Sequence, residues 1–328
     1  TYDREMKDVF AIQDDIAQSI TDALQITLSP KERRAIQNVA TSDARAYDFY
    51  LRGRSYMYTM TQRDYEHAIG MFNEAIAQDA KYALAYAGIA DAYSHMFRYA
   101  DASHENAEKA REASEKAIAL DPDSAEARAS RGLAMFISED YPEAELEFEK
   151  AIELNPNLFE SYYYAGLAYT SQGKFEKAVD MYLKAMEVSP TDYQPAVFLG
   201  QAYASLNRKH DEMKARLSSI ELIERHLKMN PHDTRALCMA ANQLSNVGDL
   251  DRGMKMAEEA LAREENEPLV LYNRACFFAM SGDTERSLDL LERAVASGWG
   301  DRAWLETDSD LDLLREDARF KALLERII

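Results

Sequence analysis

The stretch NPNLFESYYYAGLAYTSQGKFEKAVDMYLKAMEVSP, residues 155–190, decides the fold. Its first half places four residues on one helical face: Tyr162, Ala165, Gly166 and Tyr169. Gly173 follows them, and its access to positive φ suits the end of a helix. A second stripe then carries Ala178, Tyr182 and Ala185, and a proline closes the stretch. The sequence therefore predicts a helix, a turn and a second helix, with the tyrosines mainly in the core.

The same spacing recurs along the chain. Pro122, Pro156 and Pro190 lie 34 residues apart each time. Each unit also has one small residue on each helix where the two helices approach; the pairs are Gly53 with Ala68, Ala90 with Ala110, Gly132 with Ala144, Gly166 with Ala178, Gly200 with Ser219, Ala241 with Gly253 and Ala275 with Ser287. A large side chain there would separate the helices and open voids between them. A repeat of this kind predicts a stack of helix pairs.

The pattern resembles the tetratricopeptide repeat (TPR), a helix–turn–helix unit of about 34 residues with small, aromatic and proline residues at fixed positions. Seven such units are in phase, beginning near Ala46, Ala83, Ala125, Phe159, Tyr193, Thr234 and Pro268. The resemblance implies an all-α, right-handed α-solenoid with capping helices at both ends. It also implies a non-catalytic protein–protein interaction module.

Both ends of the chain extend the resemblance. The segments YDREMKDVFAIQDDIAQSI, AYDFYLRGR, LYNRACFFAMSGD and DLDLLREDARFKALL are similar to the C-terminal regions of bacterial multidomain signalling proteins. Those proteins carry a nucleotidyl cyclase, winged-helix or kinase domain in front of the repeats. The similarity implies a regulatory or partner-recruiting part of a cytoplasmic signalling protein. Because the chain begins with Thr1 rather than methionine, we expect it to be a fragment.

We expect three parts: capping or linker helices at 1–43, the repeats at 44–298, and C-terminal capping helices at 299–328. The first part has an apolar stripe made by Ile12, Ile16, Ile20 and Leu24. This stripe fits a cap on the open end of the solenoid, a dimerisation helix, or an occupant of the protein's own groove. In the last part, Trp299 and Trp304 should cover the final repeat, and the expected cap residues are Leu311, Leu313, Leu314, Phe320, Leu323 and Leu324.

Composition and charge exclude several function classes. The 328 residues include 38 basic and 58 acidic ones, giving a formal charge of −20, whereas nucleic-acid binders need a basic surface. Cys238 and Cys276 form no CxxC pair, which argues against disulfides and a cysteine-rich zinc site. The sequence has no HExxH motif, nucleophile elbow or phosphate-binding glycine loop, and no apolar run near the ~18 residues of a membrane helix. We therefore predict no enzyme activity, cofactor, metal, nucleic acid or membrane contact.

The first helix of each unit should line the concave surface of the solenoid. The partner-binding candidates there are Tyr47, Tyr50, Arg54, Asp91, Leu133, Phe136, Tyr163, Leu167, Gln194, Val197, Gln201, Arg235 and Asn242. Chaperone-binding members of the family clamp a C-terminal carboxylate with Lys and Asn where this chain has Tyr50 and Arg54, so that ligand is not expected. The apolar candidates in the middle of the groove form either an exposed interaction surface or, under tight curvature, a cluster packed on itself.

Three functions fit the sequence. In the first, the groove binds a protein or peptide segment, from a partner or from the same chain, through apolar contacts and hydrogen bonds. In the second, the array is a structural or oligomerising spacer that forms a homodimer through an end helix and positions an upstream domain. In the third, the interior of the superhelix is a sensor pocket for a small molecule.

Overall fold

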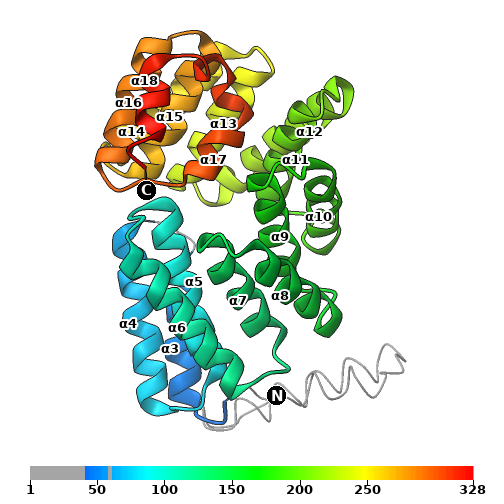
Figure 1. The fold of residues 1–328 in the computed structure, drawn as a ribbon, viewed down its shortest axis with the longest axis vertical. Helices are drawn as coiled ribbons and strands as arrows, with labels where there is room; N and C mark the ends of the chain where they lie inside the picture. The colour runs from blue at the N-terminus through cyan, green and yellow to red at the C-terminus, as the bar shows by residue number, and fades with distance from the viewer. Residues whose placement is uncertain (1–40, 58–60, 328) are drawn as a thin grey trace.

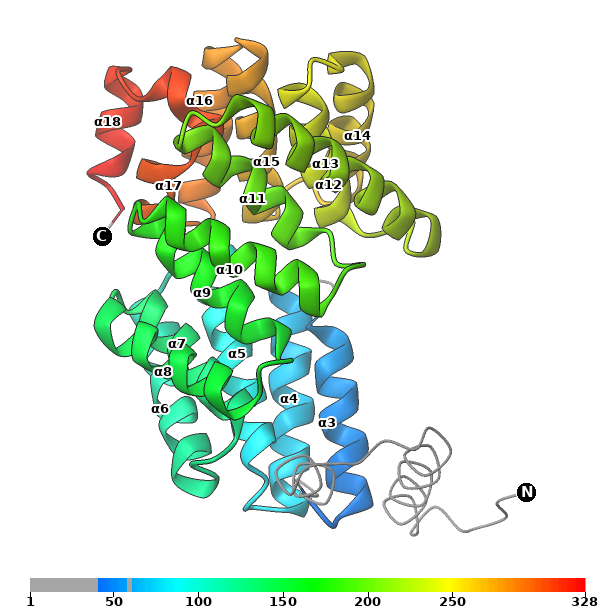
Figure 2. The ribbon, with the colours of Figure 1, turned by 90° about the vertical axis from the view of Figure 1, so that its right-hand side faces the viewer.

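The computed structural model describes residues 41–57 and 61–327. The N-terminal stripe from Ile12 to Leu24 lies outside these residues, as does nearly all of the predicted capping part at 1–43. Within the described residues every regular element is a helix and no strand occurs. Figures 1 and 2 show the helices stacked in pairs along a curved path.

The described residues contain seven helix pairs. The first helices are α3 (Ala44–Tyr56), α5 (Ala83–Tyr99), α7 (Ala125–Ile137), α9 (Phe159–Ser171), α11 (Gln194–Ser205), α13 (Thr234–Asn246) and α15 (Pro268–Ser281). The second helices are α4 (Gln62–Gln78), α6 (His104–Leu120), α8 (Tyr141–Leu154), α10 (Phe175–Val188), α12 (Lys209–Met229), α14 (Leu250–Arg263) and α16 (Thr284–Ala296). The chain ends with α17 (Arg302–Thr307), the 3₁₀ helix η2 (Ser309–Leu314) and α18 (Ala318–Leu324). The all-α solenoid is confirmed.

Helix ends follow the local sequence. Asp43, Ser124 and Asp233 cap α3, α7 and α13 by accepting hydrogen bonds from backbone N–H groups of the first turn. At the other end of α9, Gly173 has a φ of +67°, and the N–H of Lys174 donates to the carbonyl of Tyr169 at 2.9 Å. Only glycine adopts this backbone conformation without strain, so Gly173 ends the helix as predicted.

The small residues lie where the paired helices touch. A Cβ atom on Gly166 would come within 2.4 Å of Cε1 of Tyr182, whose side chain is fully buried. In the last pair, the Ser287 hydroxyl donates to the carbonyl of Ala275 at 2.7 Å. The seams therefore have no room for larger side chains, which explains why the same small residues recur in each unit.

Replacing Gly166 with alanine should lower the free energy of unfolding by about 1–3 kcal/mol, because the added methyl group forces the Tyr182 ring out of place. Gly70 is the matched control. It lies inside α4, it is exposed, and an added Cβ would meet nothing within 4 Å. Gly70→Ala should raise the stability by about 0.5–1 kcal/mol through helix propensity alone. Urea unfolding of both variants tests this; equal shifts would contradict close packing at the seam.

The curvature brings the second helix pair against the C-terminal segment. The N–H of Ala102, just after α5, donates to the carbonyl of Gly298 at 2.9 Å. Arg98 Nη2 of α5 lies 3.7 Å from Asp301 Oδ2, and both side chains are largely buried. Figure 1 shows the end of the chain beside the α5–α6 pair. The array thus bends far enough for its two halves to meet across the concave side.

The predicted C-terminal cap is mostly buried. Leu311, Leu314, Phe320 and Leu323 have at most 1% of their surface exposed, whereas Leu313 is 65% exposed. The prediction for Leu313 was wrong because η2 is a 3₁₀ helix, in which neighbouring residues point in different directions and only some face the core. As for membranes, none of the helices in the described part of the chain is long and apolar enough to span a bilayer.

Candidate functional site

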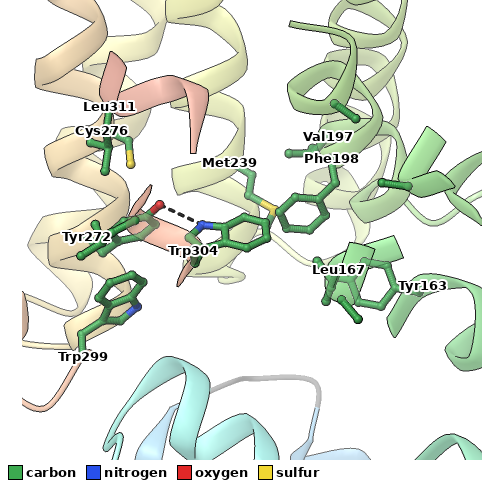
Figure 3. Packing of buried hydrophobic residues seen from close by; sticks show 14 of the residues in the cluster. Tyr163, Leu167, Val197, Phe198, Met239, Tyr272, Cys276, Trp299, Trp304 and Leu311 are labelled. Atoms are coloured by element: carbon green, nitrogen blue, oxygen red, sulfur yellow. Dashed lines mark hydrogen bonds between the residues drawn. The ribbon is translucent and has the colours of Figure 1, made fainter. Parts of the chain in front are cut away.

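The C-terminal insert, defined as residues 299–314, fills one half of the concave surface. Trp299 stacks on Tyr272 of α15 with ring centroids 4.3 Å apart, so it covers the last repeat as predicted. Trp304 reaches further and meets Phe198 of α11 edge to face at 5.5 Å. Its indole N–H donates to the Tyr272 hydroxyl at 3.0 Å (Figure 3). The insert therefore joins α11 to α15 across the concave side instead of only closing the end of the array.

Two buried carboxylates anchor this insert. Asp308 accepts hydrogen bonds from Gln201 Nε2 at 3.1 Å and from the Tyr272 hydroxyl. Asp310 accepts one from Asn246 Nδ2 at 3.2 Å. Burial and the neighbouring charge of Asp310 together raise the pKa of Asp308 to about 7, against the hydrogen bond from Tyr272. The polar side chains on this part of the concave surface are thus used inside the molecule.

The apolar candidates in the middle of the predicted groove are buried. Leu133, Phe136, Tyr163, Leu167 and Val197 each have 4% or less of their surface exposed. Of the two alternatives drawn from the sequence, the exposed interaction surface is wrong, and these residues pack on each other in a buried cluster. The physical reason is the tight curvature together with the insert, since Trp304 packs beside Phe198 in Figure 3 and belongs to the same buried cluster as Tyr163, Leu167 and Val197.

The predicted polar candidates in the same half are buried as well. Besides its bond to Asp308, Gln201 lies 3.4 Å from Asp310. Asn242 donates to Asn273 at 3.3 Å, and Arg235 Nη2 donates to the Tyr163 hydroxyl at 3.3 Å. The cavity left between these groups has a volume of only about 50 Å³. That is room for a few water molecules at most, so this part of the concave surface has no space for a small-molecule ligand. A larger cavity of about 790 Å³, lined among others by Gln194, His226 and Arg235, lies elsewhere in the described residues.

The other half of the concave surface is open. We call it the N-terminal groove and define it by Tyr50, Arg54, Asp91, Glu160, Tyr164 and Gln194. It contains two cavities of about 190 and 240 Å³, which share Arg54, Asp91 and Glu160 in their walls. Tyr50 lines the smaller cavity; Tyr163 and Gln194 line the larger one. Tyr47 lies on α3 too, half-buried, and lines neither.

An ion pair crosses this groove. Arg54 Nη2 of α3 lies 3.1 Å from Glu160 Oε1 of α9, and about a third of each side chain is exposed, 34% and 28%. Asp91 of α5 lies beside this pair; burial raises its pKa to about 7, although the Arg54 charge opposes the shift. A hydrogen bond from Ser130 to the carboxylate also opposes the shift, while the Oδ1 atom is buried and accepts no hydrogen bond from any described residue. A buried carboxylate oxygen without a donor is costly, and a ligand can satisfy it.

The residues predicted from their repeat positions include some of these groove residues but not others. Arg54 and Asp91 were predicted together, and the structure brings them to one site. Glu160 lies in the first turn of α9, at another position of its unit, and was not among the predicted residues. Tyr164 and His95 were missed because the rule selects one face of each first helix, and both lie one residue beyond it.

The cysteines show no sign of redox chemistry. Cys238 and Cys276 are both free and buried. Burial raises the pKa of Cys238 to about 12, so its reactive thiolate form is rare at neutral pH. Within residues 41–57 and 61–327, no group of three His, Cys, Asp or Glu side chains is placed to hold a metal ion.

Sequence comparison decides what the repeats are. One sequence model of the tetratricopeptide repeat matches residues 159–192, and a second matches residues 99–159 and 238–302. The chain contains tetratricopeptide repeats. A curated mouse relative, "Interferon-induced protein with tetratricopeptide repeats 3", is 26% identical over 87 residues. That match covers 26% of this chain and 22% of the mouse protein, so the chain spans about a fifth of that relative.

Solved structures of other proteins are similar to this chain in fold. The human IFIT1 dimer with m7Gppp-AAAA matches with a TM-score of 0.56 at 17% identity, covering 80% of this chain and 66% of IFIT1. At that identity the match shows the fold alone. YrrB, a TPR protein with an unusual peptide-binding site, matches with a TM-score of 0.37 at 21% identity, covering 59% of this chain and 96% of YrrB.

Proposed function

We propose that the N-terminal groove binds an extended segment of another protein. The observation that carries the proposal is the pair of neighbouring cavities that share Arg54, Asp91 and Glu160 in their walls, in the half of the concave surface that the C-terminal insert leaves open. A carboxylate oxygen without a donor inside this groove favours a ligand over a purely structural role. TPR proteins commonly present their concave surface to partners, which agrees with this proposal.

The proposed ligand is a peptide and not a nucleic acid. The two cavities have one arginine, Arg54, against four acidic side chains: Asp91, Glu126, Glu160 and Asp192. Phosphate groups require basic residues, and an acidic groove repels them. The IFIT1 structure holds the capped oligonucleotide m7Gppp-AAAA, but this charge balance gives no reason to extend such a ligand to the present chain.

We also propose that the module recruits its partner on behalf of a larger bacterial signalling protein in the cytoplasm. The support is the resemblance of both chain ends to such proteins. A spacer that forms a homodimer would leave the groove without a ligand, whereas recruitment requires a ligand in the groove. The binding experiment below therefore tests the recruitment role against the spacer role.

Peptides selected from a displayed random library against residues 1–328 provide the test. Removing both partners of the ion pair, as Arg54→Ala with Glu160→Ala, should weaken binding of the selected peptides at least about tenfold. The matched control removes the ion pair between Lys174, just before α10, and Glu145 of α8 (2.6 Å); neither residue lines the groove cavities. Lys174→Ala with Glu145→Ala should bind as the unchanged protein does. Equal binding by both variants would place recognition elsewhere.

A further inference from the structure

The larger cavity of the N-terminal groove is rich in hydrogen-bond acceptors. Its walls hold three carboxylates, those of Asp91, Glu160 and Asp192, and one guanidinium, that of Arg54. With all of them ionised, the lining holds one positive and three negative charges, while Arg98 and Arg235 act on His95 from outside this lining. Glu160 already has Arg54 as its partner, whereas Oδ1 of Asp91 has no donor among the described residues. A ligand that brings a positive charge and several donors fits this wall.

His95 adds an independent observation. It lines the same cavity, and only 8% of its surface is exposed. Its Nε2 atom lies 3.2 Å from the Tyr164 hydroxyl, while Nδ1 is buried and has no partner within the described part of the chain. Burial, reinforced by the charges of Arg235, Arg98 and Arg54, lowers the pKa of His95 to about 3, so the ring is neutral. When Nε2 carries the proton and donates to Tyr164, Nδ1 is a hydrogen-bond acceptor without a donor.

We infer that the larger cavity binds the guanidinium group of an arginine side chain carried by the partner segment, with Asp91 Oδ1 and His95 Nδ1 as acceptors. This inference rests on the proposed function of the groove. A guanidinium offers five N–H donors in a plane, enough for both acceptors, and its flat faces stack on aromatic rings. Phe159 is half-buried, lines the cavity and stacks on the buried Tyr163 with ring centroids 5.4 Å apart, so it offers a suitable surface for such a face. Lysine has three donors and no flat face, so it fits less well.

The surroundings of Asp91 make this binding dependent on pH. The groups that face it are Tyr50 and Arg54 on α3, Glu126 and Ser130 on α7, Glu160 and Tyr164 on α9, and His95 on its own helix. Because the pKa of Asp91 is raised to about 7, the free carboxyl group is mostly neutral at about pH 6 and mostly ionised at about pH 8. Arginine binding to the ionised form should therefore be about tenfold tighter at the higher pH.

The experiment uses peptides selected on residues 1–328 at about pH 8. We expect them to carry arginine, and replacement of that arginine by citrulline, which has the same shape without the charge, should weaken binding about 30-fold. Lysine should recover only part of the affinity. Asp91→Asn should cause a similar loss and abolish the pH dependence. The control Asp180→Asn changes an exposed carboxylate on α10 and should leave binding unchanged.

A stability readout separates a lost ligand contact from a damaged fold. Asp91→Asn should raise the unfolding temperature at about pH 8, because the buried side chain no longer has to ionise. Loss of binding together with a lower unfolding temperature would assign Asp91 a structural role and overturn the inference.

The outcomes also distinguish this inference from the proposed function. Selected peptides that bind in the groove but keep their affinity with citrulline would leave the proposed function standing and overturn the arginine site. If no peptide binds in the groove, the proposed function fails, and N-acetylarginine amide is then titrated by NMR. Shifts of the His95 ring signals that disappear in Asp91→Asn would support the site, and their absence would reject it.

Discussion

Replacing Trp304 with alanine should lower the free energy of unfolding by about 3–5 kcal/mol, as expected for loss of a large buried aromatic side chain. The indole is 6% exposed and packs edge to face on Phe198. It also lies under the guanidinium of Arg98, 5.4 Å from the ring, and donates to Tyr272. These contacts come from α5, α11 and α15, so the substitution loosens three units at once, and the surrounding helices cannot close the cavity without losing their own packing.

Urea unfolding followed by circular dichroism measures this effect without depending on tryptophan fluorescence. The matched control is Leu313→Ala in the same insert, where the side chain is 65% exposed and should change the stability by less than about 0.5 kcal/mol. Similar destabilisation by both substitutions would mean that the insert contributes as a whole and not through Trp304.

The helix pairs could be predicted from sequence because their determinants are local. Small residues such as Gly166 and Gly253 and turn residues such as Gly173 occupy repeat positions that recur from unit to unit. Each contacts residues of its own unit or of the neighbouring one. A solenoid is held together by such short-range contacts, so the periodic pattern contains most of the information about its fold.

The closure of the concave surface could not be predicted in the same way. It depends on the small rotation between neighbouring units, summed over several units. The sequence of a single repeat does not determine that sum. Gln201 and Asp308 are 107 residues apart in sequence, and their contact exists only because the array curves back on the insert. For this reason Gln201, Arg235 and Asn242 looked like ligand-binding groove residues in the sequence.

The candidate site could be predicted only in part. Arg54 and Asp91 were identified because their positions on the first helices are set by the repeat. Glu160, the ion-pair partner of Arg54, lies 106 residues from it, and the sequence does not say which acidic residue the curvature brings opposite that arginine. The unpartnered atoms of Asp91 and His95 are likewise properties of packing, not of sequence pattern.

Replacing Asp308 with asparagine should change how stability depends on pH. Because burial and Asp310 raise the pKa of Asp308 to about 7 in the folded protein, the folded state binds this proton more tightly than the unfolded chain does. The stability from this group is fully present below its unfolded pKa of about 4 and is lost as the pH rises through about 7. Between about pH 5.5 and pH 8.5 this amounts to a loss of about 2 kcal/mol in the free energy of unfolding. Asparagine cannot ionise, so the variant avoids this loss.

The difference in unfolding free energy between Asp308→Asn and the unchanged protein reports on the pair formed by Asp308 and Asp310, since titration of the carboxylates away from this pair cancels. We expect the variant to gain about 2 kcal/mol relative to the unchanged protein across that pH range, measured by urea unfolding at several pH values. Asp312→Asn is the control: its side chain is 67% exposed and pairs with Arg315 on the surface, so its difference should stay flat. A flat difference for Asp308→Asn as well would show that Asp308 stays ionised in the folded protein, held by the donors from Gln201 and Tyr272. The insert would then be anchored by a charged carboxylate, and lowering the pH would weaken its hold on the concave surface instead of strengthening it.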